Sequence, residues 1–399
     1  MLIFRTYCCS DDKIDFNCPE GHDPFSYLKE LSFEGAYKKY SGCNEYIEKR
    51  LNHEIEVIHH YGLTDFFLVL WDCIRYAKSQ GIFVGPGRGP LPSSMVSYCL
   101  DITQLDPMKY DLLFERFLPN NYKGEKEEFL DFDPYRQNEV YDYAIQKYNS
   151  NPNSLEITVS QDESLFAVIP SLRLICRTLQ IIYKERGQAL DLYNIDFTDK
   201  NVFDVIGNDF IDDFFIKMSP RSLEELTSGY ILHPESDNIW SHKETFDLYI
   251  ENRRQPAQKY FVNGIYNDII KTTHGLLIYQ EQIIAVLKRI GGFSPEQSNE
   301  ARRALGRRDT ALIKDIRNKF IYGSEKDGIS GCISRGITED EGNSIFTIME
   351  KMAIYAGNKS HFMSYSMLIY QKAWLNYYYP DEYKTAFSEV CNQHKVRCS

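Results

Sequence analysis

VGPGRGPLPSSMVSYCLDITQLDPMKYDLLFERFL, residues Val84–Leu118, is the stretch from which the fold of this chain is inferred. It opens on a loop in which Gly85, Gly87 and Gly89 surround Arg88. Glycines let the backbone turn sharply and bring its N–H groups close to an anion. An arginine adds a planar, permanently charged group that suits phosphate oxygens. The loop therefore predicts a phosphate cradle or, more plainly, a tight turn that carries a solvated arginine.

Regular structure is predicted on both sides of this loop. The short apolar run at residues 82–84 predicts a strand, and residues 93–100 predict a helix. The first turn of a helix has free N–H groups and a partial positive charge, both of which favour an anion. Ser94, at the start of that helix, therefore joins the loop as a candidate phosphate-binding residue.

The whole stretch, and above all its end at residues 114–118 (Phe-Glu-Arg-Phe-Leu), resembles the palm entry of the family C replicative polymerases, the alpha subunit of bacterial DNA polymerase III. In that family the loop reads Gly-Pro-Gly-Arg-Gly-Ser and helps to hold the triphosphate of the incoming nucleotide. Pro90 stands here at the serine position, which removes a hydroxyl and a backbone N–H from the cradle. The resemblance implies nucleotide-phosphate contacts by Gly85, Gly87, Arg88, Gly89 and Ser94.

Composition limits the function classes. The chain has 399 residues, 43% of them hydrophobic, and a net charge of −12, which argues against tight, sequence-independent DNA binding by the whole surface. A local basic cleft stays compatible with that charge. Ten cysteines without a Cys-x-x-Cys pair, no signal pattern and no long apolar stretch predict a reduced cytoplasmic protein with no membrane contact.

Helix signals precede the loop. Asp23 followed by Pro24 predicts a helix start, residues 44–60 have apolar side chains at helical spacing, and Thr64 opens a strongly apolar helix that ends near Gly81. With short strands expected near residues 82–84 and 129–133, the predicted fold class is α+β and mostly helical, a family C polymerase-like palm remnant with thumb and fingers helices.

The carboxylates that the family uses for catalysis are the next feature to find. These polymerases hold two divalent metals with a Pro-Asp-x-Asp-x-Asp-Phe strand. An ungapped match places Glu127 and Phe129 at the two principal ligand positions and Asp131 at the last aspartate. A shifted pairing would use Asp131 and Asp133, directly before Pro134 ends the strand. Glu127, Asp131 and Asp133 are thus the candidate catalytic acids, Asp131 and Asp133 the candidate metal ligands, and a surface acidic turn is the alternative.

Two further departures concern the palm. Leu172 occupies the place of the family's third aspartate, and no acid occurs between Glu163 and Glu185. The family's long palm insert is reduced to about twenty residues.

Residues 189–250 are acidic, with thirteen Asp and Glu against four Lys and Arg, a net charge of −9. That surface is interpreted as a solvated helical face or as a protein-binding or DNA-mimicking face.

The resemblance becomes strong again from His274. Residues 274–282 mirror the family's Tyr-Gly-x-x-x-Tyr-Gln-Glu-Gln segment, and residues 358–361 match its Asn-Lys-Ser-His motif. Residues 300–320 carry seven Lys and Arg against three acids, a cluster that in the family lies near nucleotide and template, or else a salt-bridged helix face. The predicted DNA- and nucleotide-binding fingers residues are Gln280, Arg302, Arg303, Arg307, Arg308, Tyr355, Asn358, Lys359 and His361.

The resemblance implies four parts. They are a lead-in over residues 1–20, a palm-like part with thumb-like helices over 21–190 (glycine loop 84–90, carboxylate segment 127–133), an acidic connection over 191–270 and a fingers-like helical domain over 271–399. Three functions compete: a DNA-directed nucleotidyltransferase using Mg²⁺; an inactive or very weak polymerase module, without cofactor, that still binds DNA or dNTP; and a polymerase mimic that engages or inhibits replication proteins.

Overall fold

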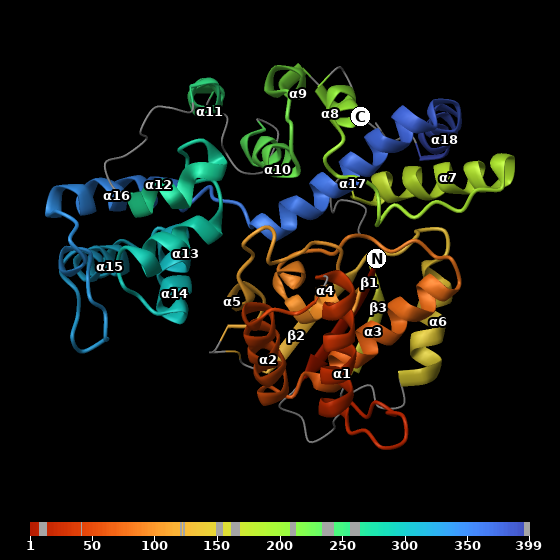
Figure 1. Cartoon of the computed structure of the whole chain (residues 1–399), viewed down its shortest axis with the longest axis horizontal. Coiled ribbons are helices and arrows are strands. Elements are labelled where there is room, and N and C mark those ends of the chain that lie inside the picture. The colour runs from red at the N-terminus through yellow and green to blue at the C-terminus, as the bar shows by residue number, and fades with distance from the viewer. Residues whose placement is uncertain are drawn as a thin grey trace. The chain divides into compact units, whose positions relative to one another are not determined.

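A computed structural model describes residues 1–7, 14–40, 42–119, 122, 124–148, 155–160, 168–207, 213–233, 243–255 and 264–394. The chain divides into two compact units. Unit 1 comprises residues 1–206 with 364–399, and unit 2 comprises residues 207–363. Helices dominate both, and one small sheet lies in unit 1 (Figure 1), which confirms the mostly helical α+β class.

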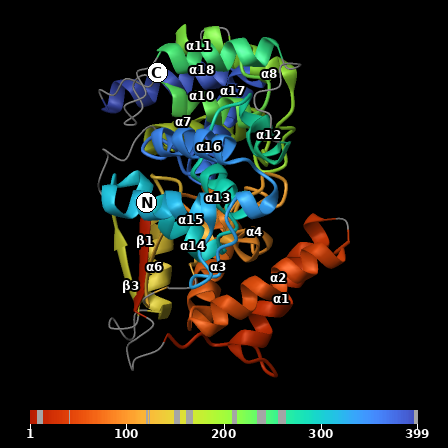
Figure 2. The ribbon, with the colours of Figure 1, turned by 90° about the vertical axis from the view of Figure 1, so that its left-hand side faces the viewer.

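The sheet is built around the first residues of the chain. β1 (Leu2–Tyr7) is its central strand and pairs antiparallel with β2 (Glu125–Leu130) and β3 (Leu155–Val159). Figure 2 shows β1 and β3 side by side. The expectation of a lead-in did not anticipate this strand, and the strand expected at residues 82–84 is only one antiparallel bridge, Val84 to Phe132. The polypeptide before the helices therefore supplies the central strand of the sheet in unit 1.

Unit 1 begins its helices where the sequence predicts. Asp23 forms a capping box with Ser26 at the start of α1, and Pro24 is its first residue. A shared apolar core fills the space around β1 and these helices, with Phe4, Phe66 and Phe117 among its fully buried side chains. The helices of this unit are α1 (Pro24–Lys39), α2 (Glu45–His60), α3 (Thr64–Ser79), α4 (Met95–Cys99), α5 (Phe114–Phe117), α6 (Gln137–Tyr148), α7 (Val168–Arg186), α8 (Lys200–Val205) and α18 (Pro380–His394).

Unit 2 is helical wherever it is described as regular, apart from isolated bridges. Ser294 and Thr338 begin their helices with capping boxes, the first with Gln297 and the second with Glu341. Its core packs around Phe320 and Phe346. Its helices are α9 (Asp213–Met218), α10 (Leu223–Leu232), α11 (Lys243–Arg254), α12 (Gly264–Ile270), α13 (Gln280–Arg289), α14 (Pro295–Gly306), α15 (Thr310–Tyr322), α16 (Glu339–Met352) and the start of α17 (Lys359–Tyr378).

Two further sequence expectations can be compared with the described residues. The seven cysteines among them are free thiols, while Cys8, Cys9 and Cys398 lie outside them. None of the described helices combines the length and the apolar character needed to cross a lipid bilayer.

Candidate functional site

The glycine loop lies against the segment that follows β2. The backbone N–H of Gly85 donates to the carbonyl of Asp131 (2.6 Å), and that of Asp133 donates to the carbonyl of Phe83 (2.8 Å). A Cβ on Gly85 would lie 2.8 Å from the Cβ of Asp131, so only glycine allows this approach. Gly87 has a φ of +113°, which also favours glycine. The loop is thus shaped by close contact with the predicted carboxylate segment.

Arg88 is held inside the protein. Its Nε lies 3.1 Å from Oδ2 of Asp131, and its Nη2 lies 3.3 Å from Oδ1. Arg88 is 6% exposed and Asp131 5%. This paired, charge-assisted geometry is the one in which a guanidinium holds a phosphate, but a carboxylate of the same chain occupies it. The sequence interpretation offered a solvated or a phosphate-bound arginine and did not anticipate an internal ion pair.

A second internal carboxylate occupies the start of the helix after the loop. Oε2 of Glu54 accepts hydrogen bonds from the Ser94 hydroxyl (2.9 Å) and from the backbone N–H groups of Met95 (2.7 Å) and Val96 (3.3 Å). Its Oε1 lies 2.5 Å from Nε of Arg50. Burial raises the pKa of Glu54 above its usual value, and the hydrogen bonds and charge of Arg50, Ser94 and Val96 offset only part of that rise. The positive end of α4 is therefore neutralised by a buried side chain.

Glu54 is a buried charged residue beside the loop that the sequence interpretation missed. A signal for it exists, because Leu51, Ile55 and Ile58 place Glu54 on the apolar face of α2. A charged residue on such a face needs a buried partner. That partner could not be named from sequence, since Ser94 is forty positions away. Asp131 thus occupies the Arg88 guanidinium, and Glu54 occupies the N–H groups at the start of α4, the two features that were expected to attract an anion.

The three candidate catalytic acids are held by different partners. Glu127 pairs with Arg5, which also binds Glu156. Asp131 pairs with Arg88, and a carboxylate oxygen of Asp133 accepts from the backbone N–H of Tyr135 (2.9 Å). Burial raises the pKa of Asp133.

These partners bear on the metal that the family implies. In the part of the chain that the structure describes, no three His, Cys, Asp or Glu side chains gather as metal ligands. Leu172, at the place of the third aspartate, is buried in α7 and has no ligand atom. Two catalytic metals need several carboxylates that converge. The residues present do not fit a two-metal magnesium site, and the roles of Asp131 and Asp133 as ligands stay predictions.

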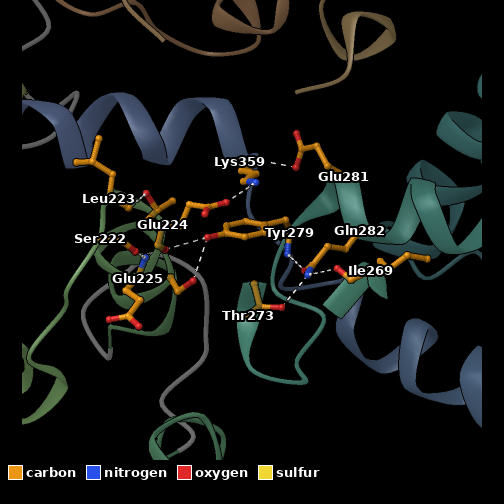
Figure 3. A network of polar contacts seen from close by, with 12 residues as sticks. Ser222, Leu223, Glu224, Glu225, Ile269, Thr273, Tyr279, Glu281, Gln282 and Lys359 are labelled. Carbon is orange, nitrogen blue, oxygen red and sulfur yellow. Dashed lines mark hydrogen bonds and ion pairs between the residues drawn. The ribbon is translucent and has the colours of Figure 1, made fainter. Parts of the chain in front are cut away.

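In unit 2 the motif at residues 274–282 forms a buried network around Tyr279 (Figure 3). Its hydroxyl lies 2.9 Å from the Ser228 hydroxyl. It also donates to the carbonyl of Glu224 (3.2 Å). Oε1 of Gln282 accepts from the backbone N–H groups of Ile278 (2.8 Å) and Tyr279 (2.9 Å). The side-chain nitrogen of Gln282 donates to the Thr273 hydroxyl (2.7 Å). These contacts fix the start of α13, so part of this motif is structural.

Lys359, predicted to face phosphate, is likewise engaged within unit 2. Its Nζ lies 3.0 Å from Oε1 of Glu224, and its backbone N–H donates to Oε2 of Glu281 (3.0 Å). The residue is 6% exposed. Oδ1 of Asn358 accepts from the Ser360 hydroxyl (2.7 Å) and, at 3.5 Å, from the backbone N–H of His361 in the first turn of α17. A phosphate role for Lys359 would require the pair with Glu224 to open.

The remaining fingers residues differ in how far they are engaged. Gln280 donates from its side chain to the carbonyl of Ala356 (3.0 Å) and accepts from Nη1 of Arg302 (3.3 Å). Tyr355 and His361 are half-buried. Arg303, Arg307 and Arg308 are exposed and make no ion pair or side-chain hydrogen bond within the described residues. These three arginines are the predicted cations that are free to contact an anion.

Comparison with known proteins locates both units in one family. The model of the bacterial DNA polymerase III alpha NTPase domain matches residues 26–203, and that of the bacterial DNA polymerase III alpha subunit finger domain matches residues 171–328. The DNA polymerase III subunit alpha of Bacillus subtilis is 23% identical over 92% of this chain and 43% of its own length. The subunits of Ureaplasma parvum (23%) and Treponema pallidum (25%) match 89% and 90% of this chain and 48% and 40% of their own lengths.

The chain therefore spans less than half the length of these relatives. The two matches overlap at residues 171–203, and they follow the same order as the motifs found in the sequence. The chain belongs to the bacterial DNA polymerase III alpha subunit family.

Proposed function

We propose that this chain is a DNA- or nucleotide-binding module with the architecture of the polymerase III alpha catalytic region, and that its nucleotidyl transfer is lost or very weak. The observation that carries the proposal is the contrast between the cations of the two units. Arg88 is buried against Asp131, whereas Arg303, Arg307 and Arg308 are exposed and unpaired within the described residues. Exposed arginines on one helix end can contact phosphates without first breaking an internal bond.

Two features support the loss of catalysis. Polymerisation needs metals that lower the pKa of the primer hydroxyl and neutralise the reacting phosphate. Asp131 already neutralises Arg88, and Leu172 supplies no oxygen. A triphosphate that entered the loop would also compete with Asp131 for Arg88 and with Glu54 for the start of α4. Catalysis would thus lack both its metal ligands and its phosphate cradle.

DNA binding is tested by titrating a labelled primer–template at two salt concentrations. The variant Arg303→Ala, Arg307→Ala, Arg308→Ala removes three exposed cations, and Lys288→Ala, Lys326→Ala, Lys351→Ala removes three exposed cations of the same unit elsewhere. We expect the arginine variant to bind at least about tenfold more weakly at low salt and with a shallower salt dependence. Equal binding by both triple variants would contradict a specific role for the arginines.

Catalysis is tested separately by primer extension with Mg²⁺ and with Mn²⁺. We expect no template-dependent product from the wild-type chain. Extension that Asp131→Ala abolishes would show that the carboxylate segment still works as an active site. This outcome would overturn the loss of catalysis and leave the DNA-binding result unaffected.

The acidic stretch favours a second candidate function. Residues 189–250 carry thirteen acids against four Lys and Arg, which suits a surface that meets a basic protein face or stands in for DNA. On this alternative the chain is a polymerase mimic that engages or inhibits replication components. It predicts that adding the chain slows primer extension by a full-length alpha subunit while the chain itself binds no DNA.

A further inference from the structure

Unit 1 contains a pocket of about 510 Å³ that belongs neither to the carboxylate segment nor to the arginines of unit 2. Its wall comes from the ends of α1 and α3, the segment 81–83 that enters the glycine loop, residues 98–104 and the turn at 190–194. The volume is within the range of small-ligand sites, about 300–1,000 Å³. The pocket is therefore large enough for a nucleotide-sized molecule.

Two lysines point their charge at this pocket, and only one is neutralised. Nζ of Lys39 lies 2.6 Å from Oδ1 of Asp101 and 3.9 Å from the ring centroid of Tyr98. Nζ of Lys78 contacts only the backbone carbonyl of Asp101, at 3.4 Å, and lies 5.0 Å from the ring centroid of Tyr193. Lys78 makes no ion pair with any described residue. Burial lowers the pKa of Lys78, and this outweighs the carboxylates of Asp101 and Asp191, which raise it, while Lys39 lowers it further. An anion beside Lys78 would favour its charged form and so raise this pKa again.

The acids of the pocket already have donors. Asp101 binds Lys39, and Asp191 accepts from the backbone N–H of Tyr193 (2.9 Å) and from the side-chain amide of Asn194 (2.7 Å). Conversely, the buried side-chain nitrogen of Gln104 finds no acceptor among the described residues. The pocket thus offers an amine that has no ion-pair partner and an amide nitrogen that has no acceptor within the described residues, and both suit a ligand rich in acceptor oxygens.

We propose that this pocket binds a phosphate monoester that carries a flat apolar group, specifically a nucleoside 5′-monophosphate. The phosphate faces Lys78 and Gln104, which supply the unmatched donors. The base lies on the apolar part of the wall, to which Ile82, Leu179 and Leu190 contribute. The site uses no residue of unit 2, so it stands or falls independently of the proposed DNA-binding function.

Calorimetric titration of the full chain with AMP tests this proposal. We expect the wild type to bind AMP, Lys78→Met to bind it at least about tenfold more weakly, and Lys78→Arg to retain part of the affinity. Lys38→Met is the matched control, because Lys38 is exposed on the same helix as Lys39 and does not line the pocket. The arginine triple variant of unit 2 should bind AMP like the wild type, which separates this site from the fingers.

Adenosine, ribose 5-phosphate and inorganic phosphate are the comparison probes, and each should bind more weakly than AMP. Adenosine as tight as AMP would overturn the phosphate contact, and inorganic phosphate as tight as AMP would overturn the nucleoside contact. If Lys78→Met fails to fold, Gln104→Leu decides the matter, because it removes an unpaired donor and should weaken AMP binding without loss of stability. No AMP binding by the wild type, or equal binding by Lys78→Met, would refute the proposal.

Discussion

The glycine loop of unit 1 and the arginine-rich helix end of unit 2 use the same kind of side chain in opposite ways. Arg88 lies buried in contact with Asp131, and the adjoining start of α4 holds Glu54. Arg303, Arg307 and Arg308 are exposed and have no carboxylate within the described residues. A guanidinium that is already paired with a buried carboxylate gains little free energy from a phosphate, because the internal ion pair must break first. An exposed guanidinium binds a phosphate without breaking such a pair.

The comparison shows that a sequence motif does not by itself fix the surroundings of its charged side chain. Both regions match the family in sequence, yet the loop arginine of unit 1 is buried against an internal carboxylate, whereas Arg303, Arg307 and Arg308 of unit 2 are exposed. In unit 1 the same chemical attraction holds the fold together. The variants below test this contrast, because substitutions in the loop should change stability and those in unit 2 should change binding.

The largest effect is expected from Glu54→Ala. The substitution leaves Arg50 and three donors of α4 without their buried acceptor, and breaking a buried ion pair typically costs about 3–5 kcal/mol. The measurement is urea denaturation followed by circular dichroism. Glu56→Ala, exposed on the same helix, is the control and should change stability little. Similar stability for both variants would show that α4 does not depend on its internal anion.

Arg88→Met should cost somewhat less, about 3 kcal/mol, since Asp131 would be left as a buried charge that can relax or take up a proton. Adding Asp131→Asn should recover much of this loss, because the second change removes the unpaired charge. A double variant no more stable than Arg88→Met would argue against the internal pair. Tight triphosphate binding that Arg88→Met abolishes would show that the loop still serves as a phosphate cradle.

Asp72 offers an internal carboxylate with a different balance. Burial raises its pKa, but hydrogen bonds from Lys147, Tyr143, Tyr148 and Arg75 outweigh that and lower the pKa to about 2. Because the pKa is depressed in the folded state, the ionised carboxylate stabilises the fold at every pH above the ordinary pKa of an aspartate. This stabilisation is lost as the pH falls toward 2. Asp72→Asn should therefore cost about 2 kcal/mol at pH 7 and clearly less at pH 3 in urea titrations. A pH-independent difference would contradict this account.

The smallest effect is expected from Arg307→Ala in unit 2. Its side chain is exposed and unpaired in the described structure, so the urea midpoint should stay unchanged. DNA binding at low salt should weaken by no more than about tenfold, as expected for one phosphate contact. Destabilisation comparable with that of Arg88→Met would remove the contrast between the two regions.

The sequence by itself determined the local elements of this protein. Asp23 with Pro24, Ser294 with Pro295 and Thr338 with Glu341 mark helix starts that the structure contains, because capping depends on residues only a few positions apart. The family was equally accessible, since its motifs are continuous stretches. The glycines of the loop were also identifiable, as a turn needs them whatever it contacts.

Only the tertiary structure decided what the charged residues do. The pairs Arg88–Asp131, Glu54–Ser94 and Lys359–Glu224 join positions 43, 40 and 135 residues apart. The strand β1 likewise exists through pairing with residues 125–130 and 155–159. Such partners are selected by how helices and strands pack, and the free energy of a charge depends on its surroundings more than on its own identity. A local pattern can therefore place an arginine in a loop. Only the packed fold determines whether internal partners already occupy that arginine or leave it available to a ligand.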